Sequence, residues 1–305
     1  MTSSTIVGGG AVSGMMLRVI RTLVAIICVI GLIVIAVMRP DDTAGPCVVV
    51  HPTTMLPAIP EASGLAIGRR NPGTLWSHND SGNETVLFAL DAAGALRRRV
   101  RVPILTRDWE DISAARCPAG DCLYIADIGD NSNRPARRRI QIYRVPEPPP
   151  GERETAPPEV FSAAYADGAH NAEALFVVGA DLFIVTRDRT GGLYRSTRPL
   201  SSSLELTLER IGQLGLEEEV VTDAEASPDE ALVVVRTSEA VLIYRTADVI
   251  RGGRVPYWLR IPIGGLREPQ GEGVALDANG MLYLVSEGRP WNRAGRFISL
   301  RCVLP

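Results

Sequence analysis

The chain has 305 residues, of which 46% are hydrophobic and 22% charged, a composition that excludes a disordered protein and suits one large or two ordinary globular domains. All 32 basic residues are arginine, so a cluster of arginines is not by itself a sign of phosphate or nucleic-acid binding. Beyond residue 40 the chain carries 29 arginines against 35 acidic residues, a formal charge of −6, and we therefore expect no nucleic-acid partner.

The first predicted element is a membrane-spanning helix over residues 22–38. Its apolar run, Leu23–Met38, has no charge and lies between Arg21 and Arg39. At about 1.5 Å per residue this run spans most of a hydrocarbon core of about 30 Å. A cleaved signal peptide is the alternative, but no small-residue cleavage site follows the run.

Arginines precede this run and two aspartates follow it, a bias that places the N-terminus in the cytoplasm. We therefore predict a short cytoplasmic N-terminus (1–21) and an uncleaved signal anchor (22–38). The protein is then a single-pass plasma-membrane protein with the bulk of the chain on the extracytoplasmic side.

Four cysteines lie outside the predicted span. Cys117 and Cys122 bracket a turn-forming tetrapeptide, so a bridge across a hairpin is geometrically reasonable. That pairing leaves Cys47 with Cys302, a bond that would join the two ends of the extracytoplasmic part and persist in an oxidising compartment. Four free thiols are the alternative.

The remainder of the chain has the pattern of an all-β protein with an internal repeat. Short apolar runs alternate with Gly, Pro, Asp and Asn clusters, and three strand-like features recur in phase about every fifty residues. The third strands contain Leu87-Phe88, Ile142-Tyr143, Leu193-Tyr194, Ile243-Tyr244 and Phe297-Ile298. This repeat predicts a five-bladed β-propeller over residues 61–305, and six blades remain possible because the second unit is long.

The last repeat is short of one strand. Residues 39–60 are predicted to contain a linker and a strand, at Cys47–His51, that completes the last blade. Closing the ring in this way removes exposed sheet edges.

A polar-x-acid pattern opens the repeats. The first strand of a blade lines the channel, and residues two apart share a face. Ser63 is therefore predicted to share a ring with Glu110, Glu173, Glu225 and Glu272, and Glu61, Asp108, Asn171, Asp223 and Gln270 to form a second layer. Converging carboxylates favour a hard cation such as Ca²⁺, with the four ring glutamates as ligands. A wide, solvated channel is the alternative.

The second strands end in polar groups that differ from repeat to repeat, as a specific site requires. Asp80, Asp127 and Arg187 are the candidate catalytic residues among them. The segments around Asp80 and Asp127 are also good turn sequences, which is an equally simple explanation. The sequence has no G-x-S-x-G elbow, H-E-x-x-H helix or Walker loop.

Several of these segments resemble motifs of bacterial phytase-like propellers, the group described as having esterase-like activity. They are Glu61–Leu65, Leu75–Gly82, Asp108–Ile112, Asp127–Asn131 and Gln270–Val274. More loosely, the pattern is similar to lactonase propellers of the gluconolactonase type. The resemblance implies acidic residues at the channel mouth that hold a divalent cation. The chain departs from the phytase pattern in having five predicted blades and no lysine to bind phosphate; Arg187 and Arg236 could substitute.

Two functions follow from these observations. The first is a membrane-anchored propeller that binds a small molecule or a protein of the cell envelope without catalysis. The second is a divalent-metal-dependent hydrolase of an ester or phosphoester at the channel mouth, with Asp80 or Asp127 as base.

Overall fold

The computed structural model describes residues 43–131, 136–216, 218–288 and 294–305. The predicted cytoplasmic segment and membrane span lie outside this part of the chain. Within it, no helix has both the length and the apolar character needed to cross a membrane. Residues Thr43–Pro305 form one compact unit.

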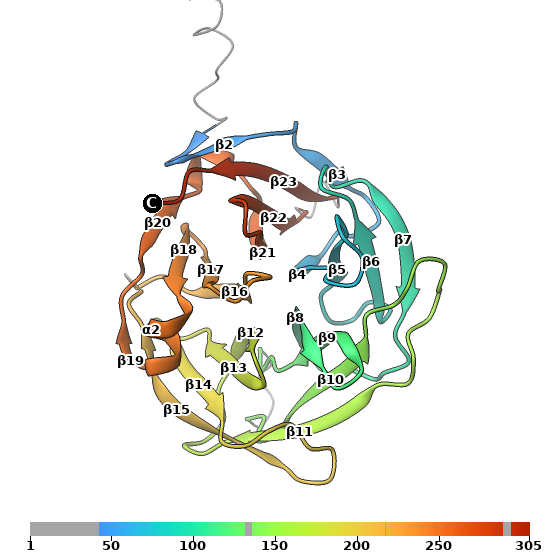
Figure 1. Cartoon of the computed structure of the whole chain (residues 1–305), viewed down its shortest axis with the longest axis vertical. Coiled ribbons are helices and arrows are strands. Elements are labelled where there is room, and N and C mark those ends of the chain that lie inside the picture. The colour runs from blue at the N-terminus through green and yellow to red at the C-terminus, as the bar shows by residue number, and fades with distance from the viewer. Residues whose placement is uncertain (1–42, 132–135, 217, 289–293) are drawn as a thin grey trace, which may run out of the picture. The chain divides into compact units, whose positions relative to one another are not determined.

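This unit is built almost entirely of β-strands, which form the propeller that the sequence predicts. The innermost strands are β4 (Ala62–Ile67), β8 (Trp109–Cys117), β12 (Ala172–Val178), β16 (Val221–Ala226) and β21 (Gln270–Leu276). Each contacts the next, and β21 contacts β4, so the inner strands close a ring around the centre (Figure 1).

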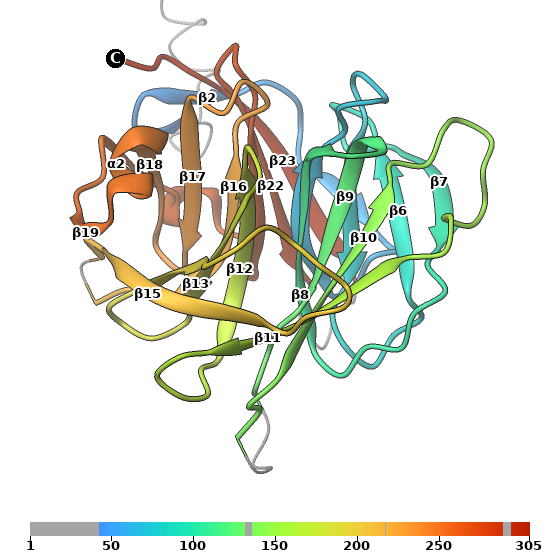
Figure 2. The same cartoon turned by 60° about the horizontal axis from the view of Figure 1, so that its bottom comes forward.

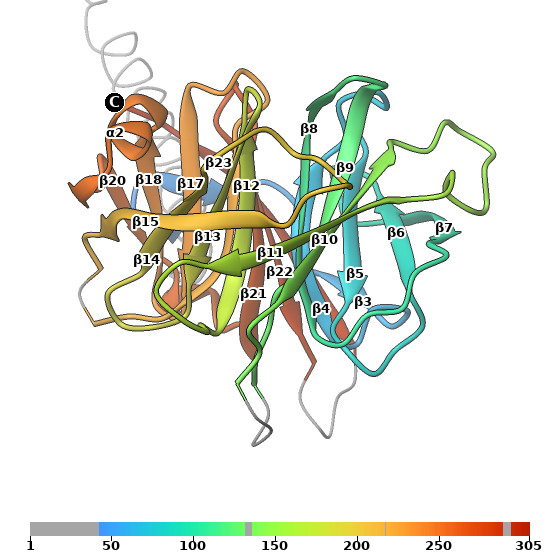
Figure 3. The same ribbon diagram turned by 90° about the horizontal axis from the view of Figure 1, so that it is seen from below.

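Three further strands extend outward from each inner strand. They are β5 (Leu75–Asn79), β6 (Val86–Leu90) and β7 (Leu96–Arg101) beside β4; β9 (Gly120–Asp127), β10 (Ile140–Pro146) and β11 (Glu159–Tyr165) beside β8; β13 (Asp181–Thr186), β14 (Gly192–Ser196) and β15 (Leu206–Leu214) beside β12; β17 (Leu232–Thr237), β18 (Ala240–Arg245) and β20 (Leu259–Pro262) beside β16; and β22 (Met281–Glu287), β23 (Gly295–Cys302) and β2 (Cys47–Val49) beside β21. In Figure 3, β9, β12 and β17 run roughly upright, and β11 and β15 cross them on the outside.

The remaining elements are short. They are β1 (Thr43–Ala44), β3 (Thr54–Leu56), α2 (Thr246–Arg251), β19 (Gly253–Val255) and the 3₁₀ turn η2 (Gly264–Leu266). Strands β11 and β15 pair in parallel and join two neighbouring groups into a nine-stranded sheet that also includes β19 (Figure 2).

Apolar side chains fill the space between neighbouring sheets. Five buried clusters, one between each adjacent pair, make up the core. The cluster between the β4 and β8 groups contains Trp76 and Trp109, both fully buried. Trp109 thus packs in the core, and the sheets are held together by burial of apolar surface.

The N-terminal strand closes the ring. Strand β2 pairs antiparallel with β23, with Cys47 opposite Cys302. These two cysteines form a disulfide with a sequence separation of 255, and Cys117 bonds to Cys122 across the turn between β8 and β9. Both predicted disulfides are confirmed.

Candidate functional site

Each inner strand has a pairing irregularity near its beginning. The register shifts in β4, β8, β12, β16 and β21 fall at Ser63, Glu110, Glu173, Thr222 and Glu272. An extra residue in one strand bends it and re-aims the side chain at that point. The shifts therefore define one equivalent position in all five strands.

Hydrogen bonds support this equivalence. Ser63 donates its hydroxyl to the backbone carbonyl of Glu110 at 2.5 Å, and Thr222 makes the same bond to Glu272 at 2.9 Å. Each joins a hydroxyl residue at this position to the corresponding residue of a neighbouring inner strand. Hydroxyl and acidic residues thus share one ring.

Glu225 is not in this ring, in contrast to the predicted alignment. It lies three positions beyond Thr222 and is buried, and its Oε1 accepts the backbone N–H of Ala114 at 2.9 Å. Burial raises the pKa of Glu225 well above its ordinary value. The prediction aligned Asp223–Glu225 with Asp108–Glu110, whereas the register of β16 makes Thr222 the equivalent of Glu110.

Asp223 also lies deeper than the predicted second layer, where it meets Asp111. Asp111 accepts the backbone N–H of Leu175 at 2.7 Å, and Asp223 accepts that of Val274 at 2.5 Å. The two carboxyls are fully buried and interact directly. Burial is the main cause that raises the pKa of Asp111, and repulsion by the Asp223 charge adds to it. Gly64, in the adjacent inner strand β4, leaves room for the Asp111 carboxylate, since a Cβ at this glycine would lie 2.4 Å from it.

Three carboxylates converge at the channel mouth. Asp80 follows β5, Asp108 precedes β8, and Glu110 is at the bulge of β8. One oxygen from each lies within 4.8 Å of the others, a spacing that suits a shared cation. We call these three residues the acidic cluster.

The loop after β9 fits around the acidic cluster. A Cβ at Gly129 would lie 1.9 Å from Glu110 Oε1 and 2.6 Å from an Asp108 oxygen, so only glycine allows this approach. Asn131 donates its side-chain amide to Glu110 and its backbone N–H to Asp108, both at 3.2 Å. The sequence marked Asp127–Asn131 both as a turn and as a segment that resembles a phytase-like motif, but it did not indicate that Asn131 contacts Asp108 and Glu110.

Electrostatic repulsion within the acidic cluster is strong. Burial raises the pKa of Asp80 to about 6, and the charges of Asp108 and Glu173 add to the rise. Burial, followed by the charges of Glu173, Asp80 and Asp108, raises the pKa of Glu110 much further. A cation among these oxygens would relieve the repulsion.

Glu173 and Arg187 lie beside the acidic cluster. Arg187 Nη1 is 2.6 Å from Glu173 Oε1, and the Arg187 side chain retains 36% of its exposure. Burial raises the pKa of Glu173 and the arginine charge opposes that rise. Arg187 is thus the one candidate catalytic residue that combines a charge partner with access to solvent.

A cavity of 310 Å³ extends the mouth toward β16 and β21. Arg187, Thr222 and Glu272 line it, together with Gln270. Burial raises the pKa of Glu272 to about 8, while a 2.8 Å hydrogen bond from Gln270 opposes the rise. Glu287, whose pKa burial raises to about 7, interacts with Asp80 and Arg187 and completes this group.

Asp127 has a supporting position. It forms a buried ion pair with Arg137, 2.9 Å between Oδ1 and Nη1, and accepts the backbone N–H of Asp108 at 2.7 Å. Its carboxylate is therefore engaged in holding Asp108. The sequence gave no indication of Arg137 as its partner.

Comparisons with known proteins give structural neighbours at low identity. No family model and no curated protein matches the chain. A luciferin-regenerating enzyme is 10% identical with a TM-score of 0.43, over 83% of this chain and 96% of that one. Hydrazine synthase of Kuenenia stuttgartiensis is 11% identical with a TM-score of 0.36, over 76% of this chain and 58% of that one. The Dos1 propeller is 10% identical with a TM-score of 0.36, over 74% of this chain and 53% of that one.

Proposed function

We propose that the chain is a five-bladed propeller of the phytase-like, esterase-like kind. Each of the five inner strands heads a four-stranded group, and the β2–β23 pairing supports closure of the fifth. A sixth blade would need another inner strand between β8 and β12, and the described residues contain none. We further propose that residues 22–38 tether this propeller to the plasma membrane, with residues 61–305 on the extracytoplasmic side.

We propose that the channel mouth binds a divalent cation, with Ca²⁺ as the candidate. The observation that carries this proposal is the convergence of Asp80, Asp108 and Glu110. Hard cations prefer carboxylate oxygens, which this cluster offers. Glu110 keeps its predicted role as a ligand, whereas Glu173 and Glu272 lie at the margin of the site and Glu225 lies below it.

The function that this arrangement supports best is hydrolysis of an ester or phosphoester at the mouth. A bound divalent cation would act as a Lewis acid toward the substrate oxygen and lower the pKa of water. Glu287, with a pKa of about 7, is suited to accept or return a proton near neutral pH. Arg187 can orient an anionic oxygen, because its guanidinium is partly exposed beside Glu173.

Binding of a cell-envelope ligand or protein without catalysis is the second candidate. The Arg187–Glu173 ion pair favours it, since it neutralises one mouth carboxylate without any cation. In this case the varied groups of the mouth would recognise a ligand without transforming it.

The test is carried out on the full chain purified in detergent. We expect Ca²⁺ to raise the melting temperature and a chelator to reverse the rise, because a ligand of the folded state stabilises it. Glu110→Gln should abolish this shift, and the matched control Glu209→Gln, at an exposed site on β15, should retain it. Turnover of p-nitrophenyl acetate or p-nitrophenyl phosphate that requires Ca²⁺ and Glu110 supports the hydrolase. Cation binding without turnover favours the second candidate, and no cation effect in the wild type would overturn the cation site.

A further inference from the structure

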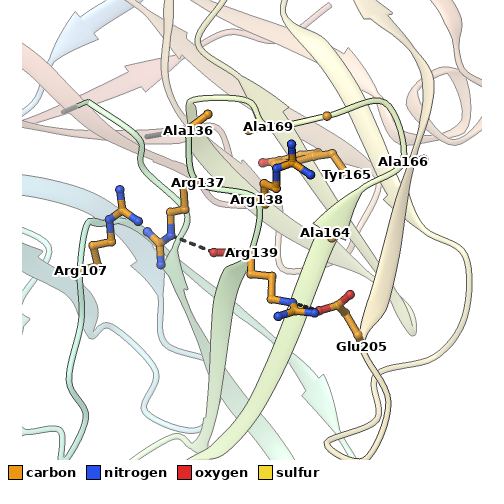
Figure 4. A pocket seen from close by; sticks show the side chains of 11 residues that line it. Arg107, Ala136, Arg137, Arg138, Arg139, Ala164, Tyr165, Ala166, Ala169 and Glu205 are labelled. Carbon is orange, nitrogen blue, oxygen red and sulfur yellow. Dashed lines mark hydrogen bonds and ion pairs between the residues drawn. The ribbon is translucent and has the colours of Figure 1, made fainter. Parts of the chain in front are cut away.

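A second, larger cavity lies beside the loop that precedes β10. It has a volume of 860 Å³, and the charged and aromatic residues that line it are Arg107, Arg137, Arg138, Arg139, Tyr165 and Glu205 (Figure 4). They come from four separate segments: the approach to β8, the approach to β10, the end of β11 and the approach to β15. We call this cavity the arginine pocket.

One of these arginines is structural. Arg137 is 5% exposed and donates to Asp127 at 2.9 Å, to the Gly129 carbonyl at 3.1 Å and to the Arg139 carbonyl at 3.1 Å. Its hydrogen-bonding capacity is directed into the protein. Arg137 therefore forms a fixed part of the pocket wall beside the other three arginines.

The other three arginines have charge available for a ligand. Arg138 is exposed, and within the described part of the chain it has no hydrogen bond or ion pair. Arg107 is 3.4 Å from Asp130, and Arg139 pairs with Glu205, but the two guanidinium side chains are 38% and 75% exposed. Exposed pairs of this kind contribute only about 0–1 kcal/mol, so a ligand can compete for them. Glu205 is the one carboxylate among the described residues that line the pocket.

Tyr165 provides an independent observation. The residue is 6% exposed and its ring packs against His170 and Tyr194, yet its buried hydroxyl has no hydrogen-bond partner among the described residues. A buried polar atom without a partner costs about 1–3 kcal/mol. A hydroxyl in this state, in the wall of a cavity lined by arginines, points to a missing polar group.

We propose that the arginine pocket binds an oxyanion, a carboxylate or phosphate carried by a small molecule. Guanidinium groups match both through paired N–H donors, and the Tyr165 hydroxyl can supply one more hydrogen bond. The part of the chain beyond residue 40 has a formal charge of −6. The arginine pocket is a local positive site on this part and attracts anions there. This site is separate from the acidic cluster and requires neither a cation nor catalysis.

The arginine pocket is nevertheless linked to the acidic cluster. Asp127 accepts the backbone N–H groups of both Arg107 and Asp108, at 3.2 and 2.7 Å, and is itself held by Arg137. One buried ion pair therefore positions a residue of each site.

The experiment is calorimetric titration of the full chain with inorganic phosphate and, separately, with citrate. Both titrations use protein and buffer freed of divalent cations on an immobilised chelating resin, so that a cation in the acidic cluster cannot capture the anion and no soluble polycarboxylate competes for the arginine pocket. We expect at least one probe to bind, more weakly as the salt concentration rises. Arg138→Gln should weaken binding about tenfold, the effect of about 1.4 kcal/mol. The matched control Arg254→Gln, at an exposed arginine on β19, should bind as the wild type does.

The two probes also identify the chemistry of the oxyanion. Binding of phosphate alone assigns the pocket to phosphate groups, and binding of citrate alone to carboxylates; either result supports the proposal. No binding of either probe at 10 mM, or equal affinities of wild type and Arg138→Gln, would overturn it. Loss of the Ca²⁺ effect at the mouth would not, because the titration contains no free cation.

Discussion

The bond between Cys47 and Cys302 should stabilise the propeller more than any other single covalent feature. It closes a loop of 255 residues, whereas the Cys117–Cys122 bond closes a loop of 5. The perturbation is replacement of each pair by alanine. All but Cys117 are almost fully buried, and alanine introduces no polar atom at these sites.

The expected magnitudes follow from chain entropy. A cross-link removes freedom from the unfolded chain in proportion to the logarithm of the loop length, which gives about 5.5 kcal/mol for the long loop and about 2 kcal/mol for the short one. With a guanidinium chloride dependence of about 5 kcal/mol per M, the unfolding midpoints should fall by about 1 M and about 0.4 M.

The assay is equilibrium unfolding of the full chain, followed by tryptophan fluorescence, for the wild type and both alanine pairs. The short-loop pair is the matched control, because it also loses two sulfur atoms from buried clusters. If the two alanine pairs lower the midpoint equally, the closing bond does not constrain the unfolded chain as argued. If the long-loop pair has the smaller effect, the reasoning is refuted.

Four further outcomes are expected. Glu110→Gln should raise the stability of the cation-free protein, because it removes a buried carboxyl under repulsion from its neighbours, and thermal unfolding in EDTA measures this. The folded-state pKa of Glu272, about 8, exceeds its ordinary 4.5, so the folded protein binds more protons between these values. Stability without cation should then fall as the pH rises from 4.5 to 8, by up to about 1.4 kcal/mol per pH unit for this group, and Glu272→Gln should flatten the decline. Tyr165→Phe should leave the unfolding midpoint unchanged or higher, since the hydroxyl makes no hydrogen bond; a marked loss would reveal a partner. Arg137→Leu should cost about 3–5 kcal/mol by leaving Asp127 buried without a counter-charge, and the double variant with Asp127→Asn should recover part of it.

Much of the fold could be predicted because its signals are local and repeated. The paired apolar and aromatic residues at Ile142-Tyr143, Leu193-Tyr194 and Ile243-Tyr244 lie in β10, β14 and β18, each the third strand of its group. One disulfide was predicted from the turn that Cys117 and Cys122 bracket, and the other because Cys47 and Cys302 were then the pair that remained. Periodicity and cysteine spacing depend on neighbours along the chain, which a sequence displays directly.

The candidate site was less predictable, because it depends on irregularities and on contacts between sheets. The alignment put Glu225 where the strand register has Thr222, because Asp223–Glu225 repeats the acid-x-acid pattern three residues further along β16. Asp80 and Asp108 meet although they belong to different sheets and were assigned to different roles. The role of Asp127 depends on Arg137, whose position is set by the course of a loop.

The carboxyl pair below the mouth has a consequence for traffic through the propeller. Asp111 and Asp223 contact backbone of β12, β21 and β4, besides the strands β8 and β16 that carry them. The pair is completely buried and contacts all five inner strands, so its two carboxyls occupy the centre of the propeller below the mouth. A ligand of the mouth would then enter and leave by the same face, and in the proposed hydrolase a tightly bound product would obstruct the next substrate.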